Sequence, residues 1–87
     1  MERTLDGTNF KVCSANTTLQ ELLKKDISNA YSWNDYYFFM LNDDNVTVYV
    51  VNKNTKKVEW TSFVAFINIL EDTIKISPEE IKEELSK

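Results

Sequence analysis

The sequence contains no histidine, and only one cysteine, one glycine and one proline. Without histidine the chain lacks the usual general base near neutral pH, the commonest metal ligand, and any Ser–His or Cys–His catalytic pair. A single cysteine cannot form an intramolecular disulfide or build a zinc or iron–sulfur site, and a single glycine excludes glycine-rich phosphate loops. We therefore expect no enzymatic activity, no catalytic residues, no cofactor and no bound metal.

Long hydrophobic runs are also missing. The longest apolar stretch, YYFFML at residues 36–41, is far shorter than the roughly 20 residues that cross a bilayer. Residues 1–10 lack the basic region followed by an apolar stretch that a signal peptide carries. The expected compartment is the cytoplasm, and no membrane partner is expected.

The charge balance is acidic. Fourteen acidic side chains against ten basic ones give a formal net charge of −4 over 87 residues. Free nucleic acid requires a clustered basic surface, and the lysines here are scattered apart from the pair at 24–25 and three in the loop at 53–57, so binding to free nucleic acid is not expected. A protein partner that is itself basic fits this charge better.

Three β-forming segments in the middle of the chain predict an antiparallel meander. Residues 36–41 are apolar on both alternating sets, which indicates a strand covered on both sides. Residues 46–51 and 58–60 follow with β-branched and aromatic side chains at alternating positions. Residues 8–14 alternate only in part, so we expect three strands, or four if this segment adds one.

The loop at residues 52–57 sets the register of the hairpin between the second and third of these strands. If it closes the turn, Val51 lies opposite Val58, and Tyr49 lies opposite Trp60. These four side chains then share one face of the hairpin. We expect that face to pack under the helix that follows in the sequence, which leaves the other face free for a partner.

Capping residues and apolar stripes predict three helices. The first begins near Thr18 and ends by residues 28–29, Thr61 or Ser62 caps the second, and Ser77 caps the third. The stripes are Leu19, Leu22, Leu23 and Ile27; then Phe63, Phe66, Ile67, Leu70 and Ile74; and finally Ile81 and Leu85. Residues 1–87 are therefore interpreted as one small α+β domain, with an antiparallel meander packed against helices in the order (β)-α-β-β-β-α-α.

Acidic side chains are the first candidate for a partner-binding surface. They lie at the predicted turns and on the last helix: Asp35, Asp43, Asp44, Glu59, Glu71, Asp72, Glu79, Glu80, Glu83 and Glu84. Spaced negative charges can imitate a phosphate backbone in a basic groove. In size, acidity and element order the chain is similar to some small anti-CRISPR inhibitors of phages and other mobile elements. That similarity implies an inhibitor of a nucleic-acid-binding protein; an ordinary solvated helix face with Glu–Lys pairs is the alternative.

The hairpin YVVNKNTKKVEW, residues 49–60, is the second candidate. It resembles the second hairpin of WW domains, with Tyr49, Asn52, Thr55 and Trp60 at the matching positions. The resemblance implies a groove for a proline-rich peptide between Tyr49 and Trp60. The sequence departs from the WW pattern at Lys53, where those domains usually carry histidine, and at residue 63, where their closing proline is replaced by phenylalanine. The alternative is that the aromatic pair belongs to the core.

Self-association is the third candidate. Three short helices are too small to cover all the aromatic side chains near the first predicted strand, among them Tyr37. A homodimer would bury such a patch, and an unpaired edge strand would favour the same outcome. The candidate aromatic surface comprises Tyr31, Trp33, Tyr36, Tyr49 and Trp60.

Overall fold

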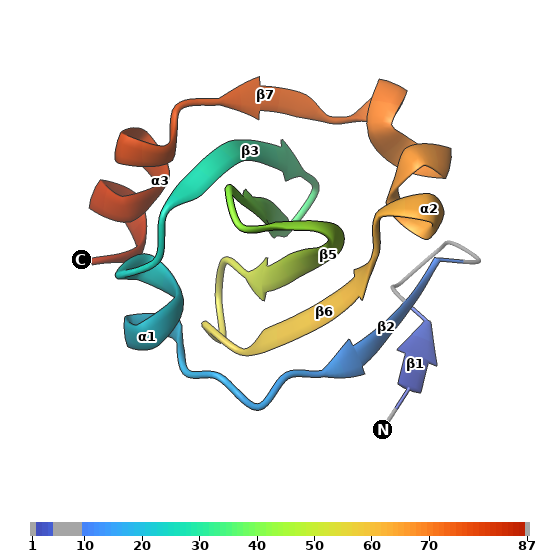
Figure 1. The fold of residues 1–87 in the computed structure, drawn as a ribbon, viewed down its shortest axis with the longest axis horizontal. Coiled ribbons are helices and arrows are strands. Elements are labelled where there is room, and N and C mark those ends of the chain that lie inside the picture. Colours follow the sequence, from blue (N-terminus) through green and yellow to red (C-terminus); the bar gives the residue numbers. More distant parts are fainter. Residues whose placement is uncertain (1, 5–9, 87) are drawn as a thin grey trace.

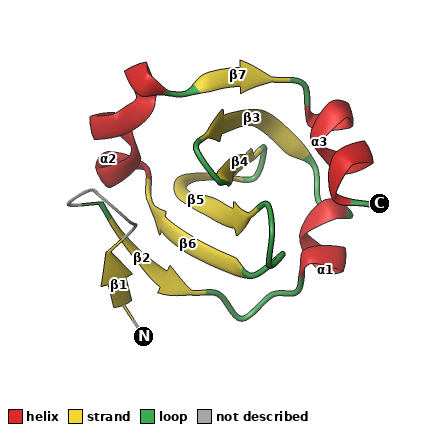
Figure 2. Ribbon diagram, turned by 180° about the vertical axis from the view of Figure 1, so that it is seen from behind, coloured by secondary structure: helices red, strands yellow, loops and turns green. Residues whose placement is uncertain are grey.

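A computed structural model describes residues 2–4 and 10–86 of the chain. The strands are β1 (Glu2–Thr4), β2 (Lys11–Ser14), β3 (Ile27–Trp33), β4 (Tyr36–Leu41), β5 (Asp44–Asn52), β6 (Val58–Ser62) and β7 (Ile74–Ile76). The helical segments are α1 (Leu19–Leu23), α2 (Phe63–Phe66), the 3₁₀ helix η1 (Ile67–Asp72) and α3 (Pro78–Leu85). Figures 1 and 2 view the molecule from opposite sides and show a strongly coiled sheet, with α1 and α3 on one side and α2 on the other.

The seven strands found among the described residues form one sheet in the order β1-β2-β6-β5-β4-β3-β7, and each neighbouring pair is antiparallel. The meander of β4, β5 and β6 is as expected, and β2 confirms a strand within the segment 8–14, of which residues 8 and 9 lie outside the described part. The expectation of three or four strands was wrong. β1, β3 and β7 add to the sheet, so the α+β class with an antiparallel sheet holds while the strand count does not.

Strand β4 is an interior strand covered on both sides, as its two apolar sets predicted. Phe38 and Phe39 are both fully buried, and they belong to different hydrophobic clusters. Phe39 packs with Leu22 of α1 and Ile81 of α3, on what we call the α1/α3 face of the sheet. Phe38 packs with Phe66 of α2, on the opposite or α2 face.

The first helix is shorter than predicted. Thr18 caps α1 as expected, because its hydroxyl oxygen accepts the Glu21 N–H at 3.2 Å. The helix ends at Leu23, however, and Ile27 begins strand β3, where it pairs with Leu41. Ile27 is buried at its helical spacing, but pairing with the aromatic strand β4 overrides the local helical pattern.

The second predicted helix is divided into three elements. Ser62 caps α2 by accepting the Ala65 N–H at 3.1 Å, as expected. The chain then continues as η1, and the Thr73 hydroxyl donates to the Leu70 carbonyl at 2.7 Å where η1 ends. Ile74 was expected in the helical stripe but lies in β7, 69% exposed. β-branched and aromatic residues are weak helix formers, and pairing of β7 with β3 competes with them.

The third helix is as predicted. Ser77 accepts the Glu80 N–H at 3.1 Å, and Pro78 occupies the first turn of α3. Ile81 and Leu85 are the buried side chains of α3, and Ile76 packs beside them. α3 therefore covers the α1/α3 face of the sheet together with α1.

The hairpin register is also as predicted, but its covering helix is not. Val51 pairs with Val58, and Tyr49 pairs with Trp60. We expected this face to lie under the helix that follows β6. That helix, α2, instead packs on the opposite face with Val48 and Val50, because Ser62 turns the chain to that side. Val51 and Val58 are covered by α1 and α3.

Candidate recognition site at the Trp60 hollow

A hollow of about 430 Å³ lies on the α1/α3 face, between the sheet and α1. It is lined by residues of β5, β6, α1 and the segments next to α1: Ala15, Asn16, Thr17, Glu21, Lys25, Thr47, Tyr49 and Trp60. We call it the Trp60 hollow. The two aromatic side chains of the WW-like hairpin therefore line a single depression.

A row of paired residues across the sheet explains why the hollow forms here. The row runs through Ala30, Phe39, Tyr49, Trp60 and Cys13, from β3 to β2. The first two are fully buried under the helices, the third is half-buried, and Trp60 is 38% exposed. The helical cover thus ends between β4 and β6, and the row emerges at Trp60.

The rim of the hollow carries one charge of each sign. Glu21 and Lys25 line it, and both are exposed. The Thr17 hydroxyl donates to Glu21 Oε2 at 3.2 Å, which orients this carboxylate. Asn16 and Thr47 add an amide and a hydroxyl that can bind either a donor or an acceptor. The rim therefore offers polar contacts without a strong preference for one sign of charge.

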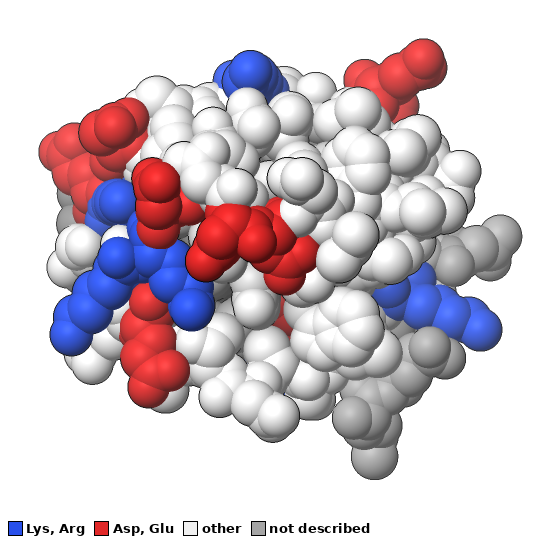
Figure 3. All heavy atoms as spheres, in the orientation of Figure 1, with Lys and Arg blue, Asp and Glu red and all other residues white. Residues whose placement is uncertain are grey.

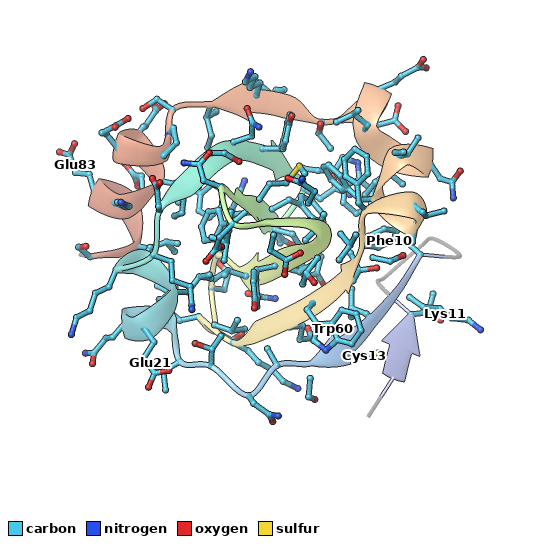
Figure 4. All side chains as sticks on the ribbon, viewed as in Figure 1. Phe10, Lys11, Cys13, Glu21, Trp60 and Glu83 are labelled. Atoms are coloured by element: carbon cyan, nitrogen blue, oxygen red, sulfur yellow. The ribbon has the colours of Figure 1, made fainter. Side chains whose placement is uncertain are left out.

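Cys13 lies beside Trp60, and Figure 4 shows the two side chains together on β2 and β6. Cys13 is a free, half-buried cysteine. It belongs to the same row across the sheet as Trp60 and Tyr49. Its thiol lies next to Trp60 in this row but is not among the groups that line the hollow.

The acidic candidates do not gather into one surface. Asp35 precedes β4, while Asp43 and Asp44 follow it, so the two groups lie at opposite ends of a strand roughly 20 Å long. Glu71 and Asp72 close η1, and the remaining glutamates lie on α3. In Figure 3 the acidic side chains appear as separate groups with neutral and basic atoms between them.

Two acidic candidates have structural surroundings that differ from an open surface. Glu59 is only 1% exposed, so the expectation that it faces a partner was wrong. Its alternation in β6 puts it opposite Trp60, on the face that packs with Val50. Asp44 accepts the backbone N–H groups of Val46 and Thr47, both at 3.0 Å, which holds its pKa below the ordinary value.

The glutamates of α3 form the densest acidic group. Glu79, Glu80, Glu83 and Glu84 are all exposed, and Figure 4 shows Glu83 pointing outward from the helix. Glu80 and Glu84 also border a small hollow of about 230 Å³ with Tyr37. Burial raises the pKa of the Tyr37 hydroxyl, and the negative charges of Glu84 and Glu80 raise it further.

A lysine also contacts Tyr37. Lys53 Nζ donates to Ser32 Oγ at 2.7 Å and to the Asn34 carbonyl at 2.8 Å. The same ammonium group lies 4.8 Å from the centre of the Tyr37 ring. Lys53, which replaces the WW-type histidine, therefore holds the β3–β4 turn against the hairpin loop.

Three of the aromatic candidates belong to or pack against the hydrophobic cluster of the α2 face. Tyr36 is buried, and its ring stacks on that of Trp33 with centroids 6.4 Å apart. The Tyr31 ring lies 5.4 Å from the ring of Phe66, and this whole group packs around Phe38. Tyr36 is therefore buried and cannot belong to an exposed patch, whereas Tyr31 and Trp33 are half-buried against Phe66 and Phe38.

Several hollow-lining residues have no signature in the sequence. Thr47 could have been placed beside Tyr49 from strand alternation. Asn16, Thr17, Glu21 and Lys25 could not, because they reach the hollow only through the pairing of β2 with β6. That pairing joins distant parts of the chain and leaves no local pattern.

Among residues 2–4 and 10–86, no group of three His, Cys, Asp or Glu side chains is arranged to hold a metal ion. None of the helices in the described part has the length and hydropathy needed to cross a bilayer. No protein-family model matches the chain, and searches of curated proteins and of solved structures found no match.

Proposed function

We propose that the protein is a non-catalytic protein-interaction module that binds an extended peptide segment of its partner in the Trp60 hollow. The observation that carries this proposal is the exposure of Trp60 beside Tyr49 in a hollow of about 430 Å³. Exposed tryptophan and tyrosine are the side chains most often found at the energetic centre of protein interfaces. Their rings provide apolar area, and their polar atoms remain available for hydrogen bonds.

The rim of the hollow supports a peptide as the occupant. Asn16 and Thr47 supply an amide and a hydroxyl, each of which can donate and accept hydrogen bonds. They can therefore bind both the N–H and the C=O groups of a peptide backbone. Glu21 and Lys25 contribute opposite charges, so their net effect on a neutral segment is small. Binding in the hollow should therefore depend weakly on salt. The similarity of the hairpin to WW domains makes proline-rich peptides the first probes to use.

A direct test follows the fluorescence of Trp60 in a Trp33→Phe variant, in which Trp60 is the only tryptophan. Acrylamide should quench this fluorescence strongly, and titration with a set of proline-rich decapeptides should give a saturable change. Tyr49→Ala should abolish the response, whereas Val46→Ala, in the same strand but outside the hollow, should preserve it. Failure of acrylamide to reach Trp60 would remove the hollow from consideration.

A second candidate function is inhibition of a basic, nucleic-acid-binding partner through α3. Its supporting observation is the exposed group Glu79, Glu80, Glu83 and Glu84 on one short helix. Two of them, Glu84 and Glu80, help to raise the pKa of Tyr37. Binding of this kind should weaken steeply as salt increases. Reversing these four charges to lysine should abolish it, while Trp60→Ala should leave it intact. The opposite pattern of effects supports the peptide site instead.

A further inference from the structure

Among the described residues, the segment that forms α2 and the first part of η1 carries no charge, in a protein where charged residues make up 28% of the chain. Residues 60–70, which include α2, carry no charge, and neither do residues 45–51 of the neighbouring strand β5. Figure 3 shows the corresponding surface as mostly neutral, while acidic and basic side chains gather on the side of α1 and α3. The charges are thus distributed unequally between the two sides of the molecule.

Three aliphatic side chains are exposed on this uncharged surface. Val64 of α2 is 77% exposed, Ile67 of η1 is 48% exposed, and Val46 of β5 is 71% exposed. Val46 alternates with Val48, which packs against α2, and Thr47 pairs with Ser62 at the start of α2. Val46 therefore lies on the same side of the sheet as α2. We call these three residues the α2 patch.

A hollow adjoins the α2 patch. It has a volume of about 440 Å³ and is lined by Phe10, Lys11, Ala65, Asn68 and Ile69. Figure 4 shows Phe10 beside α2. The lining is mainly apolar, and Lys11 marks its edge. Projecting aliphatic side chains and an apolar hollow therefore occur on the same short helical segment, as a self-complementary surface requires.

From these observations we propose that the α2 patch binds a second copy of this chain and forms a two-fold symmetric dimer. Each copy carries a formal net charge of −4, so two copies repel each other wherever their charged surfaces meet. Within the described residues, two copies that meet through the α2 patch would bring few like charges together. A strongly charged partner would find no opposite charge there. The pairing would also leave both Trp60 hollows open, because they lie on the other face of the sheet.

The test is sedimentation equilibrium of the full chain from about 5 µM to 1 mM, since a small patch gives a weak dimer. We expect reversible dimerisation that strengthens as salt is raised, because salt screens the repulsion between the two copies. Val64→Glu should raise the dissociation constant roughly a hundredfold, because both copies of the side chain leave the interface and two carboxylates meet. A glutamate in the first turn of α2 is favourable for the helix, so folding should be preserved.

Ile74→Glu is the matched control. Ile74 is 69% exposed but lies in β7, which pairs with β3 at the edge of the sheet. Its replacement should leave the dissociation constant unchanged. The proposal would be overturned by a monomeric wild-type chain at 1 mM, by association that weakens as salt is raised, or by an effect of Ile74→Glu equal to that of Val64→Glu. Circular dichroism of each variant excludes unfolding as the cause of a lost dimer.

Discussion

The two faces of the sheet are covered by helices that differ in length, charge and anchoring. On the α1/α3 face, Leu22, Ile81 and Leu85 are buried in the core, and the outer sides of both helices are charged. On the α2 face, a helix of four residues is held by one buried side chain, Phe66, and carries no charge. The contrast indicates that a sheet with two apolar faces can be closed by very different amounts of helix.

The most severe test of this difference is to remove Phe66, the single buried side chain of α2. Phe66→Ala should lower the free energy of unfolding by about 3–5 kcal/mol, because it leaves a cavity among Phe38 and Tyr31. Urea denaturation measures the loss. Hydrogen exchange should show α2 and η1 losing protection first.

Ile81→Ala is the counterpart on the other face. It should also be costly, by about 2–5 kcal/mol, but α3 retains Leu85 as a second buried contact. Protection of α3 should therefore fall less than protection of α2 does in Phe66→Ala. An equal loss of hydrogen-exchange protection in α3 and α2 would contradict the difference in anchoring.

A smaller effect is expected from the helix caps. Ser62→Ala and Ser77→Ala each remove a side-chain acceptor from a helix start, at a cost of about 0.5–2 kcal/mol. The cost should be larger for Ser62, because α3 has Pro78 and the apolar contact of Ile76 as additional support. Thermal unfolding measures both, and Ser→Asn at each position is the control that keeps a cap. A larger loss at Ser77 than at Ser62 would show that the shorter helix depends less on its cap than α3 does.

The smallest effect is a loss of stability at alkaline pH on the α1/α3 face. The pKa of Tyr37 is raised above its ordinary value of 10.0 by burial and by Glu84 and Glu80, so the folded state retains the proton more strongly than the unfolded state. The resulting contribution to the free energy of unfolding is fully present below about pH 10 and is lost as the pH rises through the raised pKa of the folded state. In Tyr37→Phe this part of the alkaline loss of stability should disappear, as measured by urea unfolding at pH 9 to 11.

The cause of the Tyr37 shift can be tested separately. The double variant Glu80→Gln and Glu84→Gln should lower the Tyr37 pKa only in part, because burial is the larger cause. Tyrosinate absorbance, compared with that of Tyr37→Phe, isolates this residue. A Tyr37 pKa fully restored to the ordinary value would show that charge, not burial, dominates.

The sequence predicted the parts of the fold that depend on neighbouring residues. The two apolar sets of β4, the register of the β5–β6 hairpin and the caps at Thr18, Ser62 and Ser77 all have local signatures. Segments with ambiguous periodicity were interpreted wrongly. Ile27 and Ile74 fit a helical stripe, but each is drawn into a strand by pairing with a distant partner.

The candidate site was predictable only in part. The pairing of Tyr49 with Trp60 followed from the hairpin loop, and the similarity to WW domains drew attention to both residues. Whether Trp60 is covered could not be predicted, because that depends on which face α2 turns to and on where α1 stops. Burial of Glu59 has the same origin, since it lies on the opposite side of β6 from Trp60.

The order of the strands in the sheet bears on how the chain folds. β3, β4, β5 and β6 are adjacent in both sequence and space, so they can assemble from neighbouring segments through short turns. The pairing of β2 with β6, with its Thr61 hydroxyl to Lys11 carbonyl bond, joins residues 50 positions apart and must close a long loop. We expect the central meander to form in the folding transition state and β2 to dock later. Because the Trp60 hollow needs that last step, it would be completed only at the end of folding.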